Sequence, residues 1–339
     1  MPHSCYDSSR RSCPGLLRLP FRFLCVLLLL ALCGCGDEEV VVVGVLDHLG
    51  LYPEILEGFR EGLADKGYVE GENLQIVFPG TPGDPRDLDF RARQLVDSDV
   101  DLILALTEPA AQAARNATQG TAIPVVFIQA ADAVRCGLVQ NHVRPGGNLT
   151  GISNEIPNHL LELRRLDWLL KMAGNPSHVY ILFDEKPESV ETMRLLTEKA
   201  RSRGVTLIPG TAGTVKEARE AVLAIPEKAQ AVFISLSPLF YHNSVMPLAI
   251  ETARRKSLPL ISATTDSVKL GGFLCYGIDP VALGRQASML AARILGGADA
   301  AAIPLQSPMF YLAVNLKTAQ DINISLEEEN LRLMDFIVR

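Results

Sequence analysis

The run Val40-Val41-Val42-Val43-Gly44-Val45-Leu46 decides the fold class of this chain. It is continuously apolar, as expected of a parallel β-strand covered on both faces, because a half-exposed strand would alternate apolar and polar residues. Behind it, Ile55, Leu56, Phe59 and Leu63 recur with the spacing of one face of an α-helix. A strand followed by an amphipathic helix is the repeating unit of an α/β fold.

The same unit recurs along the rest of the chain. A break rich in Gly and Pro at 144–148 separates two arrays of such units, so we expect two lobes, each built on a parallel sheet. The tail, 326–339, is predicted to form a closing amphipathic helix. The other strands are predicted at 74–78, 101–106, 124–128, 179–183, 205–208, 231–235, 258–262 and 273–278, and the other helices at 86–98, 109–118, 160–172, 190–203, 216–225, 241–256 and 280–295.

The N-terminus has the layout of an export signal. Four Arg residues precede an apolar run over 23–32, which is too short to span a bilayer as a helix. The small residue Gly34 before Cys35 resembles a bacterial lipobox, in which the cysteine is acylated and becomes the new N-terminus. We therefore predict a lipoprotein signal peptide over 1–34 and a lipid anchor on Cys35. An ordinary secretory signal with an incidental cysteine is the alternative.

The composition of the remaining chain excludes several partners. Without residues 1–34, 305 of the 339 residues remain, which is long for one core and favours two domains. This part carries ten more acidic than basic side chains, because four Arg but only Asp7 lie in the signal. An acidic body without a cluster of Lys and Arg argues against nucleic acid and against anionic lipid as partners.

Only two cysteines, Cys136 and Cys275, lie beyond the N-terminal segment. Both sit in apolar stretches, which favours two buried free thiols, although an oxidising compartment would also permit a disulfide between them. Two cysteines cannot form a structural zinc site unaided, and the histidines have no metal-ligand spacing. We predict no cofactor and no metal.

The candidate ligand-binding residues follow the predicted strands, because open α/β sheets bind ligands beyond the carboxyl ends of their strands and often against helix N-termini. In the first array these residues are Asp47, His48, Thr107, Glu108, Gln129 and Asp132. In the second array they are Asp184, Glu188, Ser189, Ser237, Thr264 and Asp266, with Ser235 close by.

Three of these residues also have a plain structural interpretation. Glu108 can complement the dipole of the helix that it opens, Asp266 can cap a short helix, and His48 can be an exposed loop residue. Catalytic motifs are missing from the sequence: it has no Gly-x-Ser-x-Gly, no His-Glu-x-x-His and no phosphate-binding loop ending in Gly-Lys-Ser/Thr. The protein is therefore not predicted to be an enzyme.

Nine short motifs, in order, carry a resemblance to a known family. They are Tyr68-Val69-Glu70-Gly71-Glu72-Asn73, Gly83-Asp84-Pro85, Pro109-Ala110-Ala111-Gln112-Ala113, Pro124-Val125-Val126-Phe127, Gly137-Leu138-Val139, Pro145-Gly146-Gly147-Asn148-Leu149-Thr150-Gly151, Thr265-Asp266-Ser267-Val268-Lys269, Ala282-Leu283-Gly284-Arg285-Gln286 and Asn315-Leu316-Lys317. Together they resemble the substrate-binding lipoproteins of ABC transporters that take up tryptophan or other aromatic amino acids. The resemblance covers about residues 40–325.

That family is similar to type 1 periplasmic binding proteins. The resemblance implies two Rossmann-like, doubly wound lobes with parallel sheets, joined by three crossovers near 146–151, 278–279 and 306–310. The first lobe would hold 36–152 plus 279–306, and the second 153–278 plus 307–339. It also implies a monomer in the periplasm or on the outer cell surface that captures a small molecule by hinge closure and delivers it to ABC permease and ATPase subunits.

Several polar positions depart from the family. Where the family commonly has an Asp-Asn pair suited to a ligand ammonium, this chain has Ser237-Pro238, and Asp184-Glu185 stands where Asn-Pro is usual. The resemblance therefore does not establish an aromatic amino acid as the ligand. Asp184, Glu108 or Glu188 could supply the negative charge that the replaced Asp provides in the family. The alternatives are a ligand-sensing lipoprotein that feeds a separate membrane signalling protein, or a lipoprotein enzyme on the same scaffold.

Overall fold

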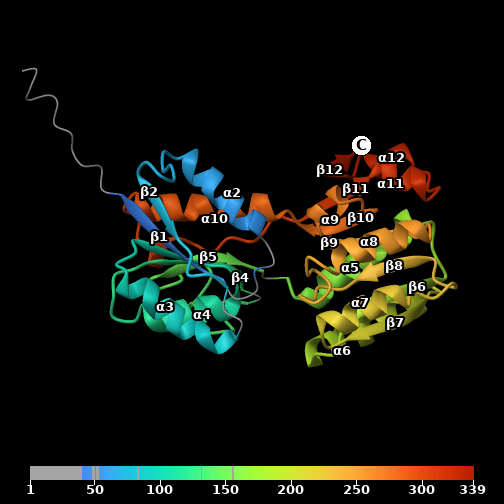
Figure 1. Ribbon diagram of the computed structural model, residues 1–339, viewed down its shortest axis with the longest axis horizontal. Helices are drawn as coiled ribbons and strands as arrows, with labels where there is room; N and C mark the ends of the chain where they lie inside the picture. The colour runs from blue at the N-terminus through green and yellow to red at the C-terminus, as the bar shows by residue number, and fades with distance from the viewer. Residues whose placement is uncertain (1–39, 48–49, 51–52, 82–83, 131, 155) are drawn as a thin grey trace, which may run out of the picture. The chain divides into compact units, whose positions relative to one another are not determined.

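The protein contains two β-sheets, each covered by helices on both faces (Figure 1). The structure, a computed structural model, describes residues 40–339 except 48–49, 51–52, 82–83, 131 and 155. The predicted signal peptide, Cys35 and His48 therefore lie outside the described residues. Among the described residues, no helix combines the length and apolar character that crossing a bilayer requires.

Sheet A has five parallel strands in the order β2-β1-β3-β4-β5. Its central strands β1, β3 and β4 come from continuous apolar runs, and the described side chains of β3 are buried throughout, as two-sided coverage requires. The strands are β1 (Val41–Leu46), β2 (Leu74–Val77), β3 (Leu102–Ala105), β4 (Val125–Ala130) and β5 (Leu149–Ser153). The intervening helices are α2 (Pro53–Ala64), α3 (Leu88–Asp97), preceded by a 3-10 turn at Pro85–Asp87, and α4 (Glu108–Ala117).

One face of sheet A is covered by helices from opposite ends of the chain. Helix α10 (Pro280–Leu295) lies beside α2, and both pack on the same face of the sheet (Figure 1). Asp279 starts α10 by accepting a hydrogen bond from the Ala282 N–H, and Pro280 occupies the first turn. Helices α3 and α4 cover the other face.

Sheet B has seven strands in the order β12-β11-β10-β9-β8-β6-β7. Its pairings are parallel except that β11 runs antiparallel to β10. The strands are β6 (His178–Asp184), β7 (Thr206–Ala212), β8 (Ala231–Ile234), β9 (Leu260–Thr264), β10 (Leu274–Ile278), β11 (Tyr311–Asn315) and β12 (Phe336–Val338). The helices are α5 (Asn158–Met172), α6 (Pro187–Ser202), α7 (Val215–Leu223), α8 (Met246–Arg255), α9 (Thr265–Lys269), α11 (Leu316–Asp321) and α12 (Glu328–Leu331), and a 3-10 turn at Ala300–Ala302 precedes β11.

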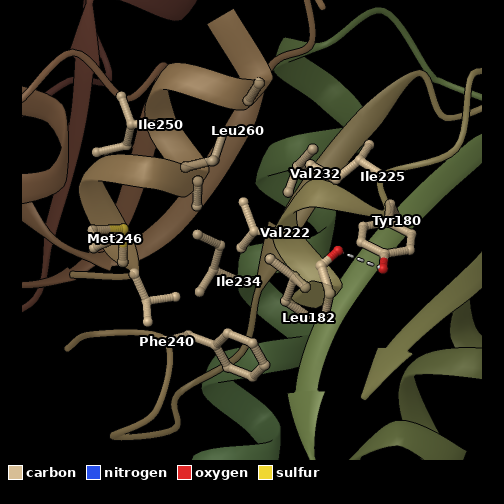
Figure 2. Packing of buried hydrophobic residues seen from close by; sticks show 14 of the residues in the cluster. Tyr180, Leu182, Val222, Ile225, Val232, Ile234, Phe240, Met246, Ile250 and Leu260 are labelled. Carbon is tan, nitrogen blue, oxygen red and sulfur yellow. Dashed lines mark hydrogen bonds between the residues drawn. The ribbon is translucent and has the colours of Figure 1, made fainter. Parts of the chain in front are cut away.

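The two faces of sheet B bury separate cores. Figure 2 shows the core under α7 and α8, where Leu182, Val232 and Ile234 of the sheet meet Val222 and Met246 of the helices. The one polar group among the labelled side chains, the Tyr180 hydroxyl, donates a hydrogen bond to the Ala221 carbonyl in this core (Figure 2). The second core lies under α5, α6 and α11.

The predicted α/β fold with two lobes is confirmed, but three local predictions are wrong. The tail is not an amphipathic helix: it forms the one-turn α12 and then β12, which pairs with β11. Residues 149–151, expected within the first crossover at 146–151, belong to the edge strand β5. Its buried Thr150 is tolerated because the hydroxyl donates to the Ile303 carbonyl. Helix α8 begins at Met246 rather than at Tyr241.

Both described cysteines are free thiols, as predicted, and no disulfide joins them. Cys275 is buried, and this burial raises its pKa to about 12. Cys136 is only partly buried, so the prediction of burial is confirmed for one of the two.

Candidate functional site

The candidate residues of sheet A lie at the carboxyl ends of its strands. Asp47 directly follows β1 and is nearly buried, and its carboxylate accepts a hydrogen bond from the Gly50 N–H at 2.9 Å. Thr107 follows β3 by two residues and caps α4, where its hydroxyl accepts the Ala110 N–H at 3.3 Å. Glu108 is the first residue of that helix, so its charge complements the helix dipole as one interpretation predicted.

Two further candidates, Gln129 and Asp132, belong to the carboxyl end of β4. Gln129 is the penultimate residue of β4. Asp132 follows the strand and accepts the Arg135 N–H at 3.0 Å, which organises its own loop. Thus Asp47, Thr107 and Asp132 each accept a hydrogen bond from a nearby backbone N–H.

Sheet B presents a different arrangement at the ends of β6 and β8. Asp184 is the last residue of β6 and is 3% exposed. Its Oδ2 accepts the Ser237 hydroxyl at 2.7 Å, which ties the β8–α8 loop to β6. Its Oδ1 is buried without a hydrogen-bond partner, and so is Oγ of Ser235, the residue after β8. The Lys186 ammonium is 4.0 Å from Oδ2 and largely exposed.

A pocket of about 90 Å³ opens beside these strand ends. We call it the β6–β8 pocket. Its polar side chains come from the N-terminal turns of α5 and α6 and from the loop after β8, and its apolar side chains come from the core. The lining residues are Asn158, Glu162, Ile181, Phe183, Glu188, Ser189, Thr192, Met193, Leu196, Ser235 and Leu236.

A buried ion pair forms the floor of this region. Glu162 and Arg165, both on α5, are almost completely buried, and Nη1 of Arg165 lies 2.7 Å from Oε2 of Glu162. Glu162 Oε1 accepts the Leu236 N–H at 2.6 Å, and Arg165 Nε donates to the Tyr276 carbonyl at 3.0 Å. Burial raises the pKa of Glu162, although Arg165 opposes that shift. The pair therefore joins α5 to the loop after β8 and to the middle of β10.

Thr264 and Asp266 line a second, more open pocket of about 340 Å³. Its other lining residues lie at or just before the start of α2, in the loop before α8 and its first turn, and on or just after α9: Gly50, Pro53, Glu54, Tyr241, His242, Asn243, Met246, Pro247, Ser267 and Leu270. The interpretation of Asp266 as a helix cap is wrong. Thr264 occupies the N-cap position of α9, and the Asp266 carboxylate instead accepts a hydrogen bond from Lys269 at 3.0 Å.

Asp279 connects this edge of sheet B to α10. Its Oδ1 caps α10, while its Oδ2 accepts the Thr265 hydroxyl at 2.6 Å and lies 3.4 Å from the Lys269 ammonium. Burial acts to raise the pKa of Asp279, but these three donors outweigh it and the pKa is lowered. One carboxylate therefore holds together the helix that packs on sheet A and the segment that follows β9.

The structure brings Glu188 and Ser189 together in the β6–β8 pocket, and Thr264 and Asp266 in the larger pocket. Asp184 and Ser237 bind each other directly. Sequence reasoning missed Asn158 and Glu162, because they lie on α5, where no strand end marks them. Within the described residues, no group of three or more His, Cys, Asp and Glu side chains is arranged to hold a metal ion.

Two lobes, each built on a mainly parallel sheet, match the fold of periplasmic binding proteins. The chain belongs to the family described as ABC transporter substrate binding protein, which matches residues 39–336. The resemblance predicted from the nine motifs is therefore confirmed, and the relatives are solute-binding proteins rather than enzymes.

Individual relatives cover most of the chain. A tyrosine-binding protein of Clostridioides difficile is 27% identical over 300 residues, which are 88% of this chain and 81% of that protein. A conserved domain protein from Vibrio cholerae has a solved structure with a TM-score of 0.69 and 26% identity, over 88% of this chain and 99% of that one. The fold is also shared with an ABC domain from Streptococcus pneumonia in complex with L-Trp, with a TM-score of 0.70 and 24% identity, over 88% of this chain and 100% of that one.

Proposed function

We propose that this protein is the extracytoplasmic, lipid-anchored solute-binding component of an ABC importer. The observation that carries the proposal is the gathering of polar side chains at the carboxyl ends of the strands in both sheets of a chain from this family. Parallel α/β sheets bind small molecules at this edge, where strand ends and helix N-termini supply polar groups. Permease and ATPase subunits are the partners that the family implies.

The proposed mechanism is capture by hinge closure. The first lobe would comprise 36–152 plus 279–306 and the second 153–278 plus 307–339, with the connections between them acting as the hinge. A ligand that contacts both lobes shifts the equilibrium toward the closed form. The size of this shift equals the difference between its binding free energies for the closed and open forms. Asp279, which bonds to α10 and to α9, stands in the second connection and supports a hinge role there.

The ligand class that we propose is an amino acid or a related small amine. Relatives named for tyrosine and for L-Trp support an amino-acid-like ligand. The carboxylates at the strand ends, among them Asp47, Asp184 and Glu188, support a ligand with an ammonium group. The lipid anchor would be on Cys35, since its context resembles a lipobox.

Mass spectrometry of small molecules released by denaturing the full chain, purified in detergent, tests this function. Any recovered molecule is then titrated back by calorimetry. We expect one-site binding of the unchanged molecule, and a ligand at 100 times its Kd should stabilise the protein by about 2.7 kcal/mol. A turned-over product would instead indicate an enzyme, and an empty protein that ignores a metabolite panel would contradict a solute-binding role.

A further inference from the structure

Two buried oxygen atoms at neighbouring strand ends lack hydrogen-bond partners. They are Asp184 Oδ1 and Ser235 Oγ, on residues that are only 3% and 7% exposed. The strands that carry them pair in parallel, with Leu182 of β6 opposite Ile234 of β8. Buried polar groups are nearly always hydrogen-bonded, so two exceptions at the ligand-binding edge of one sheet require an external partner.

The chemistry of the two groups indicates what that partner is. A carboxylate oxygen only accepts hydrogen bonds, so Asp184 Oδ1 needs an N–H or O–H donor. Oδ2 already accepts Ser237, and the exposed Lys186 ammonium, at 4.0 Å from Oδ2, is too far for a hydrogen bond. Asp184 Oδ1 therefore needs a hydrogen-bond donor as its partner. The Ser235 hydroxyl can likewise accept a hydrogen bond from a donor.

The β6–β8 pocket, into which Ser235 faces, has an unbalanced negative charge. Its lining includes Glu162 and Glu188 but no Lys, Arg or His. Arg165 neutralises Glu162 from the buried side, whereas Glu188, in the first turn of α6, has no ion-pair partner among the described residues. A positively charged group entering this pocket would gain an ion pair without displacing an existing one.

The pocket also limits the shape of its occupant. Its apolar walls are Ile181, Phe183, Met193 and Leu196. Its volume of about 90 Å³ is well below the roughly 150 Å³ of a protein cavity that admits benzene. A methylene stem therefore fits better than an aromatic ring.

We propose that the β6–β8 pocket receives an alkylammonium group, and that the ligand is a net-positive small molecule such as a basic amino acid or an aliphatic diamine. Its ammonium would bind Glu188 and Ser235, with the stem against Phe183 and Met193. Asp184 does not line this pocket, and its side chain leaves β6 on the face opposite to Phe183. A second N–H-donating group would therefore have to extend past the end of β6 to reach Asp184. The inference rests on the proposed function and specifies the ligand chemistry of the same site.

Calorimetry on the full chain in detergent tests the charge requirement with matched probes. The cations are L-lysine, L-arginine and 1,5-diaminopentane; the neutral counterparts are L-norleucine and L-citrulline, and L-tyrosine and L-tryptophan represent aromatic ligands. We expect at least one cation to bind and its neutral counterpart to bind about fivefold more weakly or worse, since the ion pair with the exposed Glu188 carboxylate is screened by solvent.

Three variants locate the effect. Glu188→Gln should weaken cation binding about fivefold, because Glu188 is exposed, and Asp184→Asn about tenfold or more, because Asp184 is buried. Glu185→Gln is the matched control, because Glu185 is exposed, lies between the two and does not line the pocket. Glu188 is itself exposed, so its variant should fold even if Asp184→Asn does not.

The outcomes separate the two proposals. Binding of tyrosine or tryptophan, or recovery of a neutral ligand, with all cations inactive would overturn the alkylammonium assignment and leave the solute-binding function intact. Cation binding that is unchanged by Glu188→Gln would overturn the pocket assignment. No binding by any probe, together with no molecule released on denaturation, would count against both.

Discussion

At the scale of single residues, the buried pair of Glu162 and Arg165 is where we expect the largest single-residue effect on stability. Glu162→Ala would leave the Arg165 guanidinium buried without its charge partner and the Leu236 N–H without its acceptor. Breaking a buried ion pair in this way typically costs about 3–5 kcal/mol. The free energy of unfolding, measured by urea denaturation, should fall by that amount.

The control for this prediction is Arg194→Ala. Arg194 also pairs with glutamates, Glu191 and Glu198, but all three side chains are more than half exposed. Exposed ion pairs contribute little because solvent screens them. If both variants changed the urea midpoint equally, the distinction between the buried and exposed pairs would be wrong.

Asp279 should make stability depend on acid pH. Its pKa is lowered in the folded protein by Thr265, Ala282 and Lys269 against the opposing effect of burial. A group with a lowered folded pKa stabilises the protein above its unfolded pKa, and this contribution disappears as the pH falls through the folded value. The thermal midpoint of the wild type should therefore drop below about pH 4 more steeply than that of Asp279→Asn.

Asp266→Asn is the matched control for Asp279. Asp266 shares Lys269 as a partner but caps no helix. Its variant should retain most of the acid dependence. An Asp279→Asn profile that is parallel to the wild-type profile between pH 5 and 3 would contradict the assignment.

The sequence predicted site residues only where a strand end marks them. Asp184 and Ser237 each follow an apolar run, and the structure joins them by a hydrogen bond. Glu162 lies within the predicted helix 160–172. The local sequence there does not show whether a glutamate is half of a buried ion pair or an exposed surface residue. Its role depends on contacts with Leu236 and Tyr276, which are distant in sequence.

At the scale of elements, the contact between α2 and α10 depends on glycine. A Cβ atom on Gly58 would overlap the Val281 carbonyl oxygen, and one on Gly284 would overlap the Ile55 carbonyl oxygen. Backbone atoms cannot rotate away, so Gly58→Ala and Gly284→Ala should force the helices apart. Overpacking of this kind typically costs about 1–3 kcal/mol, which thermal or urea unfolding would detect.

The same interface provides a control in Gly62→Ala. The atom that its Cβ would meet first is the Ser288 hydroxyl oxygen, which is on a side chain that can rotate. We expect this variant to be less destabilised than the other two. Equal losses at all three positions would indicate that backbone proximity is not what limits the packing.

Elements were predictable where the local pattern and the tertiary environment agree. The buried strands β1, β3, β4, β6 and β8 are mainly apolar runs, and the helices between them have amphipathic spacing, so both were predicted within a few residues. The buried parallel strand β5 was not predicted. Strand β12 was not predicted, because three residues become a strand only through pairing with β11. The antiparallel pairing of β11 and β10 likewise has no local signal.

At the scale of the whole molecule, the chain crosses between its two sheets more than once. Helix α10 returns to sheet A after β10, and the chain then enters sheet B again at β11. The repeated strand–helix units predicted two lobes, but this return came from the family resemblance alone. Packing of α10 on α2, more than 200 residues away in sequence, agrees with that expectation.

The last prediction concerns the attachment of the whole molecule to a membrane. Cys35 follows the small residue Gly34, whereas Cys33 follows the bulky Leu32, so acylation should require Cys35. In a bacterial host, Cys35→Ser should move the protein from the detergent phase to the aqueous phase on phase partition, while Cys33→Ser should leave it in the detergent phase. Ligand binding should not change in either variant, because the candidate site lies wholly within 47–266. If Cys35→Ser remained in the detergent phase, an anchor other than acylated Cys35 would have to hold the protein at the membrane.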